Sequence, residues 1–110
     1  MMYDELQKIV RNYNWDDGFE LPQKVLSDER CDLALALEIF YLGDGYRYFQ
    51  MYENNIAGSQ EWLEFISKLY DEIVNGKYEK METHFEIPLS KVQRYQLRKN
   101  NISEVLLTDL

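Results

Sequence analysis

Apolar residues recur through the first part of the chain at the three- and four-residue spacing of an amphipathic helix. The first such stripe predicts a helix over residues 3–13 that ends at Asn14. Pro22 suits the first turn of a second, short helix, because the N–H that proline lacks would have no partner there. This second helix should end near Ser27 or Asp28. The first stripe consists of Tyr3, Leu6, Ile9, Val10 and Tyr13.

The run LALALEIFYL is the most apolar part of the chain, and its pattern is ambiguous. Its alternating start is typical of a strand, but Ala and Leu are strong helix formers. Asp32 suits an N-cap, and Gly43 stands where a C-cap glycine belongs. We therefore predict a helix from Leu33 to Leu42 that is apolar nearly all round and is the most buried element.

Two further helices are expected in the middle of the chain. The tyrosine-rich residues 46–55 predict the fourth helix. Ser59 is the predicted N-cap of the fifth and clearest helix, which runs from Gln60 to Asn75 and is ended by Gly76. The expected buried face of the fifth helix consists of Trp62, Ile66, Leu69, Tyr70, Ile73 and Val74.

The C-terminal part has the weakest pattern. Residues 77–87 predict a loop or, near residues 80–87, a short extended segment. A last helix is expected over Lys91–Lys99, with Val92 and Tyr95 facing the core. The tail should then pack onto the body through Ile102, Val105 and Leu106.

The composition agrees with one domain spanning residues 1–110, folded as an all-α bundle of five or six short helices. The chain is 45% hydrophobic and 15% aromatic, which is enough to supply a core. Its formal net charge of −8 argues against binding to nucleic-acid phosphates or to an anionic membrane surface, and favours a basic partner. Residues 87–110 depart from this balance, because four bases and two acids give them a net charge of +2.

The N-terminus and the cysteine content predict a cytoplasmic protein. The N-terminal residues lack the apolar run of a secretory signal, and no apolar run is long enough to span a bilayer. Cys31 is the only cysteine, so an internal disulfide is excluded. Its position before the apolar helix is typical of a small core residue.

The string NYNWDDGFELPQ places two adjacent carboxylates between a tryptophan and a glycine. We interpret it as a structural corner. Asn14, Asp16 and Asp17 are expected to accept hydrogen bonds from backbone N–H groups of the loop. Trp15 is expected to bury its ring between the first and third helices and to donate its indole N–H, and Gly18 to supply a positive φ.

The alternative interpretation of this string is a hydrolase or metal-dependent enzyme. Asp16 and Asp17 would then act with a spatial neighbour such as Glu20 or His84. Side chains of adjacent residues point in different directions, however, and the ligand spacings of calcium and zinc sites are absent. We therefore predict no catalytic residue, no metal and no cofactor.

A cluster of aromatic residues around Arg47 is the candidate partner-binding surface. Tyr and Arg are frequent anchors of protein interfaces. The competing interpretation places the same side chains in the core and rim of the bundle, because aromatic residues at helical spacing are usually buried. The candidate surface consists of Tyr41, Tyr46, Arg47, Tyr48 and Tyr52.

These patterns favour a small protein–protein interaction module over an enzyme. The negative charge suits neutralisation of a basic partner in the manner of an immunity protein or antitoxin, since electrostatic attraction would speed association. A homo-oligomer joined through the aromatic cluster is the second alternative, beside the hydrolase.

Two strings of the chain, NYNWDDGFELPQ and CDLALALEIFYLGDGYRYF, resemble a bacterial family known only as domain of unknown function 4274. The resemblance covers about residues 12 to 50 and is carried by the Asn-Trp-Asp-Asp-Gly and Asp-Gly-Tyr-Arg-Tyr strings. It implies a bacterial source and a small stand-alone domain. It implies no activity, cofactor or site residue.

Overall fold

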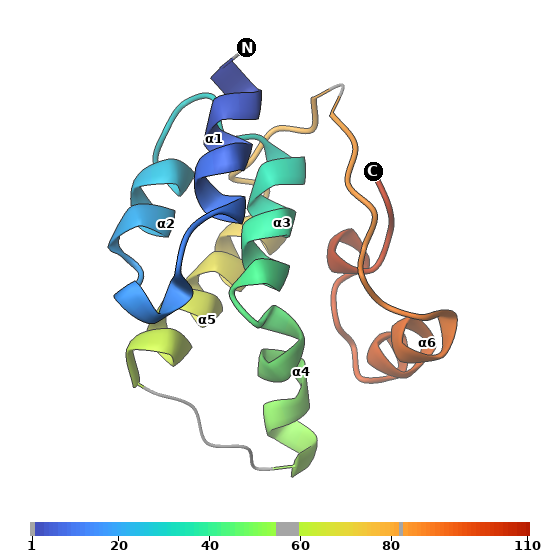
Figure 1. Cartoon of the computed structure of the whole chain (residues 1–110). Coiled ribbons are helices and arrows are strands. Elements are labelled where there is room, and N and C mark those ends of the chain that lie inside the picture. Colours follow the sequence, from blue (N-terminus) through green and yellow to red (C-terminus); the bar gives the residue numbers. More distant parts are fainter. Residues whose placement is uncertain (1, 55–59, 82) are drawn as a thin grey trace.

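The described part of the backbone folds into six α-helices and two short 3₁₀ helices (Figure 1). This computed structural model describes residues 2–54, 60–81 and 83–110. These ranges contain no strand, so the predicted all-α bundle of five or six helices is confirmed. The elements are α1 (Met2–Arg11), η1 (Trp15–Asp17), α2 (Glu20–Leu26), α3 (Leu33–Leu42), α4 (Gly45–Asn54), α5 (Gln60–Val74), α6 (Lys91–Lys99) and η2 (Glu104–Leu106).

Helix α3 forms the centre of the core, as its apolar sequence predicts. Leu35, Ile39 and Phe40 are fully buried, and the helix packs against α1, α4 and α5. The predicted N-cap is confirmed, because Oδ1 of Asp32 accepts a hydrogen bond from the backbone N–H of Leu35 over 3.0 Å. The predicted boundaries of α3 are confirmed as well.

A tight junction joins α3 to α4. Gly43 follows the last residue of α3, and Asp44 comes next with a φ of 69°. A Cβ on Gly45 would lie 2.2 Å from Cε2 of Phe40, so only glycine fits at the start of α4. The indole N–H of Trp62 donates to the carbonyl oxygen of Gly43 over 2.8 Å, and this bond ties α5 to the junction.

An ion pair between the partly exposed Arg11 and the buried Glu38 fixes α1 on α3. The carboxylate of Glu38 lies in the core, where an uncompensated charge would be strongly unfavourable. Nε and Nη2 of Arg11 donate to its two oxygens over 2.9 and 2.8 Å. Gln7 adds a third hydrogen bond of 3.2 Å, so two side chains of α1 satisfy one carboxylate of α3.

The buried face of α5 differs from the prediction at three positions. Phe65, which the prediction left out, is buried, whereas Val74 is 41% exposed. Tyr70 is only partly buried. The apolar stripe of α5 follows Trp62, Ile66 and Ile73, and position 74 lies about 100° further round the helix, on its solvent side. Ser59, the predicted cap of this helix, lies outside the described residues.

The orientation predicted for α6 is wrong, although its boundaries are confirmed. Val92 and Tyr95 are 65% and 60% exposed, and the buried residue of this helix is Leu97. The hydroxyl of Ser90 and the side chain of Gln93 form a capping box at its start. The helix therefore faces the body with Leu97, and its Arg94 side chain bonds to backbone carbonyl groups before and after the helix.

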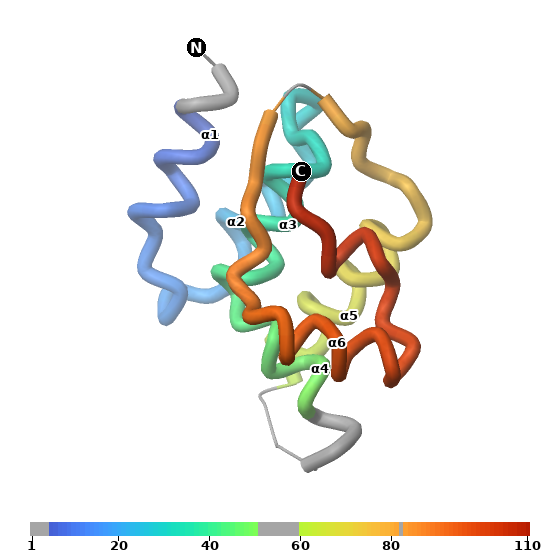
Figure 2. Tube along the Cα trace, turned by 90° about the vertical axis from the view of Figure 1, so that its right-hand side faces the viewer, coloured from blue at the N-terminus to red at the C-terminus, as the bar shows by residue number. Residues whose placement is uncertain are grey.

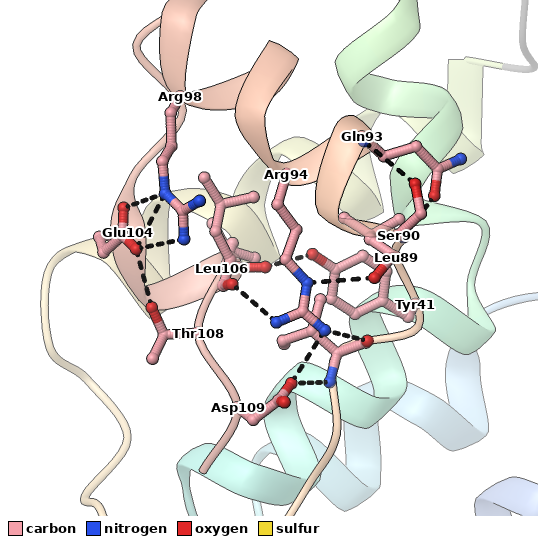
Figure 3. A network of polar contacts seen from close by, with 12 residues as sticks. Tyr41, Leu89, Ser90, Gln93, Arg94, Arg98, Glu104, Leu106, Thr108 and Asp109 are labelled. Atoms are coloured by element: carbon pink, nitrogen blue, oxygen red, sulfur yellow. Dashed lines mark hydrogen bonds and ion pairs between the residues drawn. The ribbon is translucent and has the colours of Figure 1, made fainter.

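The last residues of the chain, which follow α6 and which we call the C-terminal segment, run back alongside residues 83–89 (Figure 2). The backbone N–H of Leu110 donates to the carbonyl oxygen of Phe85 over 2.9 Å, and Leu106 and Leu107 are fully buried. Figure 3 shows the Arg94 guanidinium between residues 83–89 and the C-terminal segment. It donates to backbone carbonyl groups of both segments and to the carboxylate of Asp109.

Candidate functional site

The Asn-Trp-Asp-Asp-Gly string forms the tight corner between α1 and α2. Oδ1 of Asn14 accepts a hydrogen bond from the backbone N–H of Asp16 over 3.1 Å, so Asn14 caps the short helix η1. Gly18 follows η1 with a φ of 97°, a conformation that strongly favours glycine. The hydroxyl of Tyr13 donates to the Gly18 carbonyl over 2.8 Å and closes the corner.

Trp15 makes edge-to-face contacts with neighbouring aromatic rings. It meets Phe19 and Phe65 at centroid distances of 6.4 and 6.2 Å with steep interplanar angles. It also lies against Gly43, where a Cβ would come within 3.2 Å of Cζ3 of its ring. The partly buried ring therefore joins the corner to α5 and to the α3–α4 junction, whereas the sequence predicted that it would be buried between the first and third helices.

The two aspartates of the corner behave differently from the prediction. Both side chains are exposed, and within the described residues neither carboxylate accepts a hydrogen bond. Only Asn14 has the predicted contact with a loop N–H. The single turn of η1 directs both carboxylates toward solvent, because its own amides are satisfied by Asn14 and by the helix itself. Asp16 and Asp17 are thus available to a ligand.

Asp17 lies at the rim of a hollow between the corner, α2 and α5. The hollow has a volume of about 510 Å³. It brings together residues that are more than forty positions apart in the sequence. We call it the acidic hollow, and its lining consists of Asp17, Gly18, Phe19, Glu20, Gln23, Glu61, Glu64, Phe65 and Lys68.

Two phenylalanines in this lining are stacked on each other. Phe19 lies on Phe65 with ring centroids 4.8 Å apart and an angle of 21° between the rings. Phe65 is buried and Phe19 is half-buried. The acidic hollow therefore offers the partly exposed ring of Phe19 beside its carboxylates, with the buried Phe65 ring stacked against it.

The charge of the hollow is strongly negative. Four carboxylates line it against one cation, Lys68. Glu20 has a distant partner in Lys24, at 3.7 Å, and both side chains are largely exposed, so this pair neutralises little. The pKa of the neighbouring Tyr13 hydroxyl is raised, first by burial and then by the charges of Asp17 and Glu20. The negative potential thus extends to the corner behind the hollow.

The side chains of the predicted aromatic surface contact different parts of the chain itself. The Tyr41 hydroxyl donates to the carbonyl oxygen of Leu106, and Tyr48 packs on Tyr70 at 5.7 Å. The Arg47 guanidinium lies 5.8 Å from the ring of Trp62. A partner-binding role of the cluster stays a prediction. Tyr46 packs partly buried against the core, and the side chain of Tyr52 lies outside the described residues.

His84 does not join the aspartates. Its Nδ1 lies 3.3 Å from the carbonyl oxygen of Leu110, in the C-terminal segment. Glu20 is the neighbour that does share the hollow with Asp17. Within residues 2–54, 60–81 and 83–110, no group of three His, Cys, Asp or Glu side chains is arranged to hold a metal ion.

A second hollow, of about 520 Å³, lies between the α2–α3 loop and residues 77–81. Arg30 in its lining already pairs with Asp28, at 2.7 Å. Burial raises the pKa of the Cys31 thiol to about 12, so this thiol stays protonated and unreactive at neutral pH. The buried hydroxyl of Tyr78 has no hydrogen-bond partner among the described residues. This hollow offers a ligand less uncompensated charge than the acidic hollow.

Comparison with known proteins identifies a family. A family model described as a domain of unknown function, DUF4274, matches residues 3–74, which include every residue of the acidic hollow. No curated protein and no solved structure matches the chain. In the part of the chain that the structure describes, none of the helices has the length and apolar character that a membrane crossing requires.

Proposed function

The chain belongs to the DUF4274 family, and from the geometry of the acidic hollow we propose that it is an interaction module that binds a basic segment of a protein partner. The observation that carries this proposal is the combination of four carboxylates with a stacked Phe19–Phe65 pair in one hollow. The site lies entirely within the residues that match the family.

The two features of the hollow suit one kind of side chain. Lysine and arginine carry a cation at the end of an apolar stem. The stem would lie on the exposed part of the Phe19 ring while the cation meets the carboxylates of Glu61 and Glu64. A cation beside an aromatic face gains about 0.5–1 kcal/mol even at exposed sites. A hollow of this size holds one or two such side chains, which is a small anchor for a larger contact.

The charge of the whole molecule supports the same partner chemistry. Residues 1–86 carry 18 acids and 8 bases, a net charge of −10. Such a field attracts a basic protein over a distance of about one Debye length, roughly 8 Å at physiological salt. We propose neutralisation of a basic partner, as an immunity protein does, in the cytoplasm, where the unpaired Cys31 would stay reduced.

Calorimetric titration with a synthetic basic peptide that contains lysine and tyrosine tests this proposal. The variant with Glu61→Gln and Glu64→Gln should bind about three- to thirty-fold more weakly, because it loses two exposed charge contacts worth about 0.3–1 kcal/mol each. The variant with Glu79→Gln and Glu86→Gln is the matched control, since it has the same net charge but leaves the hollow intact. Equal affinities of the two variants would refute the site.

A further inference from the structure

The outward face of α6 carries apolar and basic side chains together. Val92 and Tyr95 are 65% and 60% exposed, one turn apart on the helix. Nζ of Lys99 lies 5.4 Å from the centroid of the Tyr95 ring and continues the same stripe. We call Val92, Tyr95 and Lys99, together with Lys91 at the start of the helix, the outer face of α6.

The cations of this outer face are not neutralised by the rest of the described chain. Figure 3 shows that Arg94 and Arg98 turn toward the C-terminal segment. There Arg94 pairs with Asp109, and Arg98 pairs with Glu104. Lys91 and Lys99 form no ion pair within the described residues. The helix therefore presents two positive charges around one exposed aromatic ring.

The outer face of α6 and the acidic hollow are complementary in charge and in chemistry. One offers two lysines and a tyrosine, and the other offers four carboxylates and two stacked phenylalanines. Figure 1 shows α6 on the opposite side of α3 and α4 from α2, so a chain cannot close this contact on itself. We propose that the outer face of α6 docks in the acidic hollow of a second copy of this chain.

This inference rests on the proposed function, because it names the basic segment that the hollow receives. The contact joins different surfaces of the two copies, so it is heterologous and adds copies head to tail. A helix of nine residues is about 13.5 Å long and buries little area. A weak, concentration-dependent association is therefore expected, rather than a permanent dimer.

Charge reversal on both sides gives a stringent test. A hollow variant carries Glu61→Lys and Glu64→Lys, and a helix variant carries Lys91→Glu and Lys99→Glu. All four side chains are exposed, so the fold should tolerate the changes, which circular dichroism would check. Average mass is measured by sedimentation equilibrium at about 0.15 M salt, where the repulsion between acidic copies is screened beyond about 8 Å.

The wild-type chain should show an average mass that rises with concentration. Each variant alone should stay a monomer, because its hollow and its helix then have charges of the same sign. An equimolar mixture of the two variants should associate again, since the unchanged basic helix of the hollow variant meets the unchanged acidic hollow of the helix variant, and the two reversed surfaces also carry opposite charges. A mixture that stays monomeric, or a wild-type chain that stays monomeric at millimolar concentration, would overturn the proposal.

Titration with the basic peptide separates this inference from the proposed function. The helix variant keeps the acidic hollow and should bind the peptide as tightly as the wild type does. If it does so while the mixture of variants stays monomeric, docking of a second copy is wrong and the proposed function stands. If it does not bind the peptide, both proposals fail. A Tyr95→Ser variant should also lower the self-association at least three-fold without any change of net charge.

Discussion

Phe19 stacks on Phe65 with ring centroids 4.8 Å apart, and this contact joins the corner after α1 to the middle of α5. The two residues are 46 positions apart in the sequence. The stack has two consequences in the fold. It holds Asp17 and Glu20 opposite Glu61 and Glu64, and it gives the acidic hollow an aromatic surface.

Replacement of Phe65 by alanine should remove this support. Truncation of a buried phenylalanine typically lowers the free energy of unfolding by about 3–5 kcal/mol, because it removes apolar contact and leaves a cavity. Phe65 is 5% exposed and contacts the rings of both Trp15 and Phe19. Urea denaturation measures the loss, and Phe65→Leu should lose less than half as much. A loss below about 1 kcal/mol for Phe65→Ala would contradict the assigned packing.

Gly45→Ala should destabilise the protein through a steric clash. The added Cβ would lie 2.2 and 2.3 Å from two ring atoms of Phe40 and 2.6 Å from its carbonyl oxygen. Overpacking of this kind costs about 1–3 kcal/mol or more, although alanine is the better helix former. Thermal denaturation of Gly45→Ala, with and without Phe40→Leu, checks the cause. If the second substitution relieves none of the loss, the ring of Phe40 is not responsible.

The pair of Arg11 and Glu38 predicts a strong non-additivity. Arg11→Met leaves the Glu38 carboxylate buried without its guanidinium, which costs about 1–4 kcal/mol, with the lower values favoured because the Arg11 side chain is 56% exposed. The double variant Arg11→Met, Glu38→Leu removes both charges. It should be closer to the wild type in free energy of unfolding than Arg11→Met alone. Additive losses in the urea midpoints would show that the two residues do not act as a pair.

The carboxyl of Asp28 should titrate at unusually low pH. Hydrogen bonds from the side chain and then the backbone of Arg30 lower its pKa from 3.8 to about 2. Because the folded-state pKa is depressed, the stabilisation is complete above about pH 4 and is lost as the pH falls toward 2. Carbon-detected NMR titration measures this pKa directly.

Variants of Arg30 provide the control for this titration. In Arg30→Ala the Asp28 pKa should rise only part of the way toward its ordinary value, because the backbone N–H of residue 30 still donates to the carboxylate. In Arg30→Lys it should fall between the pKa of the wild type and that of Arg30→Ala, since lysine keeps the charge without the bidentate contact. An unchanged pKa of Asp28 in Arg30→Ala would mean that another group causes the shift.

Helix α3 could be predicted to the residue because all of its signals are local. The N-cap Asp32, the strong helix formers and the C-terminal Gly43 each act within one turn of the helix. The turn of the backbone at residues 14–18 was also foreseeable for the same reason, since Asn14 and Gly18 fix the backbone through contacts within the corner, but the exposure of the Asp16 and Asp17 carboxylates was not.

The orientation of α6 could not be read from its sequence. Its hydrophobic pattern holds Val92, Tyr95 and Leu97, and these residues do not share one face. What orients the helix is the Arg94 guanidinium, which is held by carbonyl groups up to 13 residues away. Hydropathy carries no information about such a contact, so the sequence predicted the wrong side of the helix to face the core.

The acidic hollow was missed because it is assembled from distant segments. Asp17 and Glu20 come from the corner and α2, and Glu61 and Glu64 from α5. A partial signal existed, since the two glutamates of α5 lie one turn apart on the side away from its apolar stripe. Nothing in the sequence places them opposite the corner. That placement follows from the Phe19–Phe65 stack, which forms only in the folded chain.

The location of the bound basic peptide tests the central claim most directly. Backbone amide resonances of the chain should be followed by NMR during titration with the lysine- and tyrosine-containing peptide. We expect the largest shifts on residues 17–23 and 61–68, and we expect these shifts to disappear in the Glu61→Gln, Glu64→Gln variant. Largest shifts at residues 41–48, or shifts that persist unchanged in that variant, would contradict the claim that the acidic hollow is the binding site.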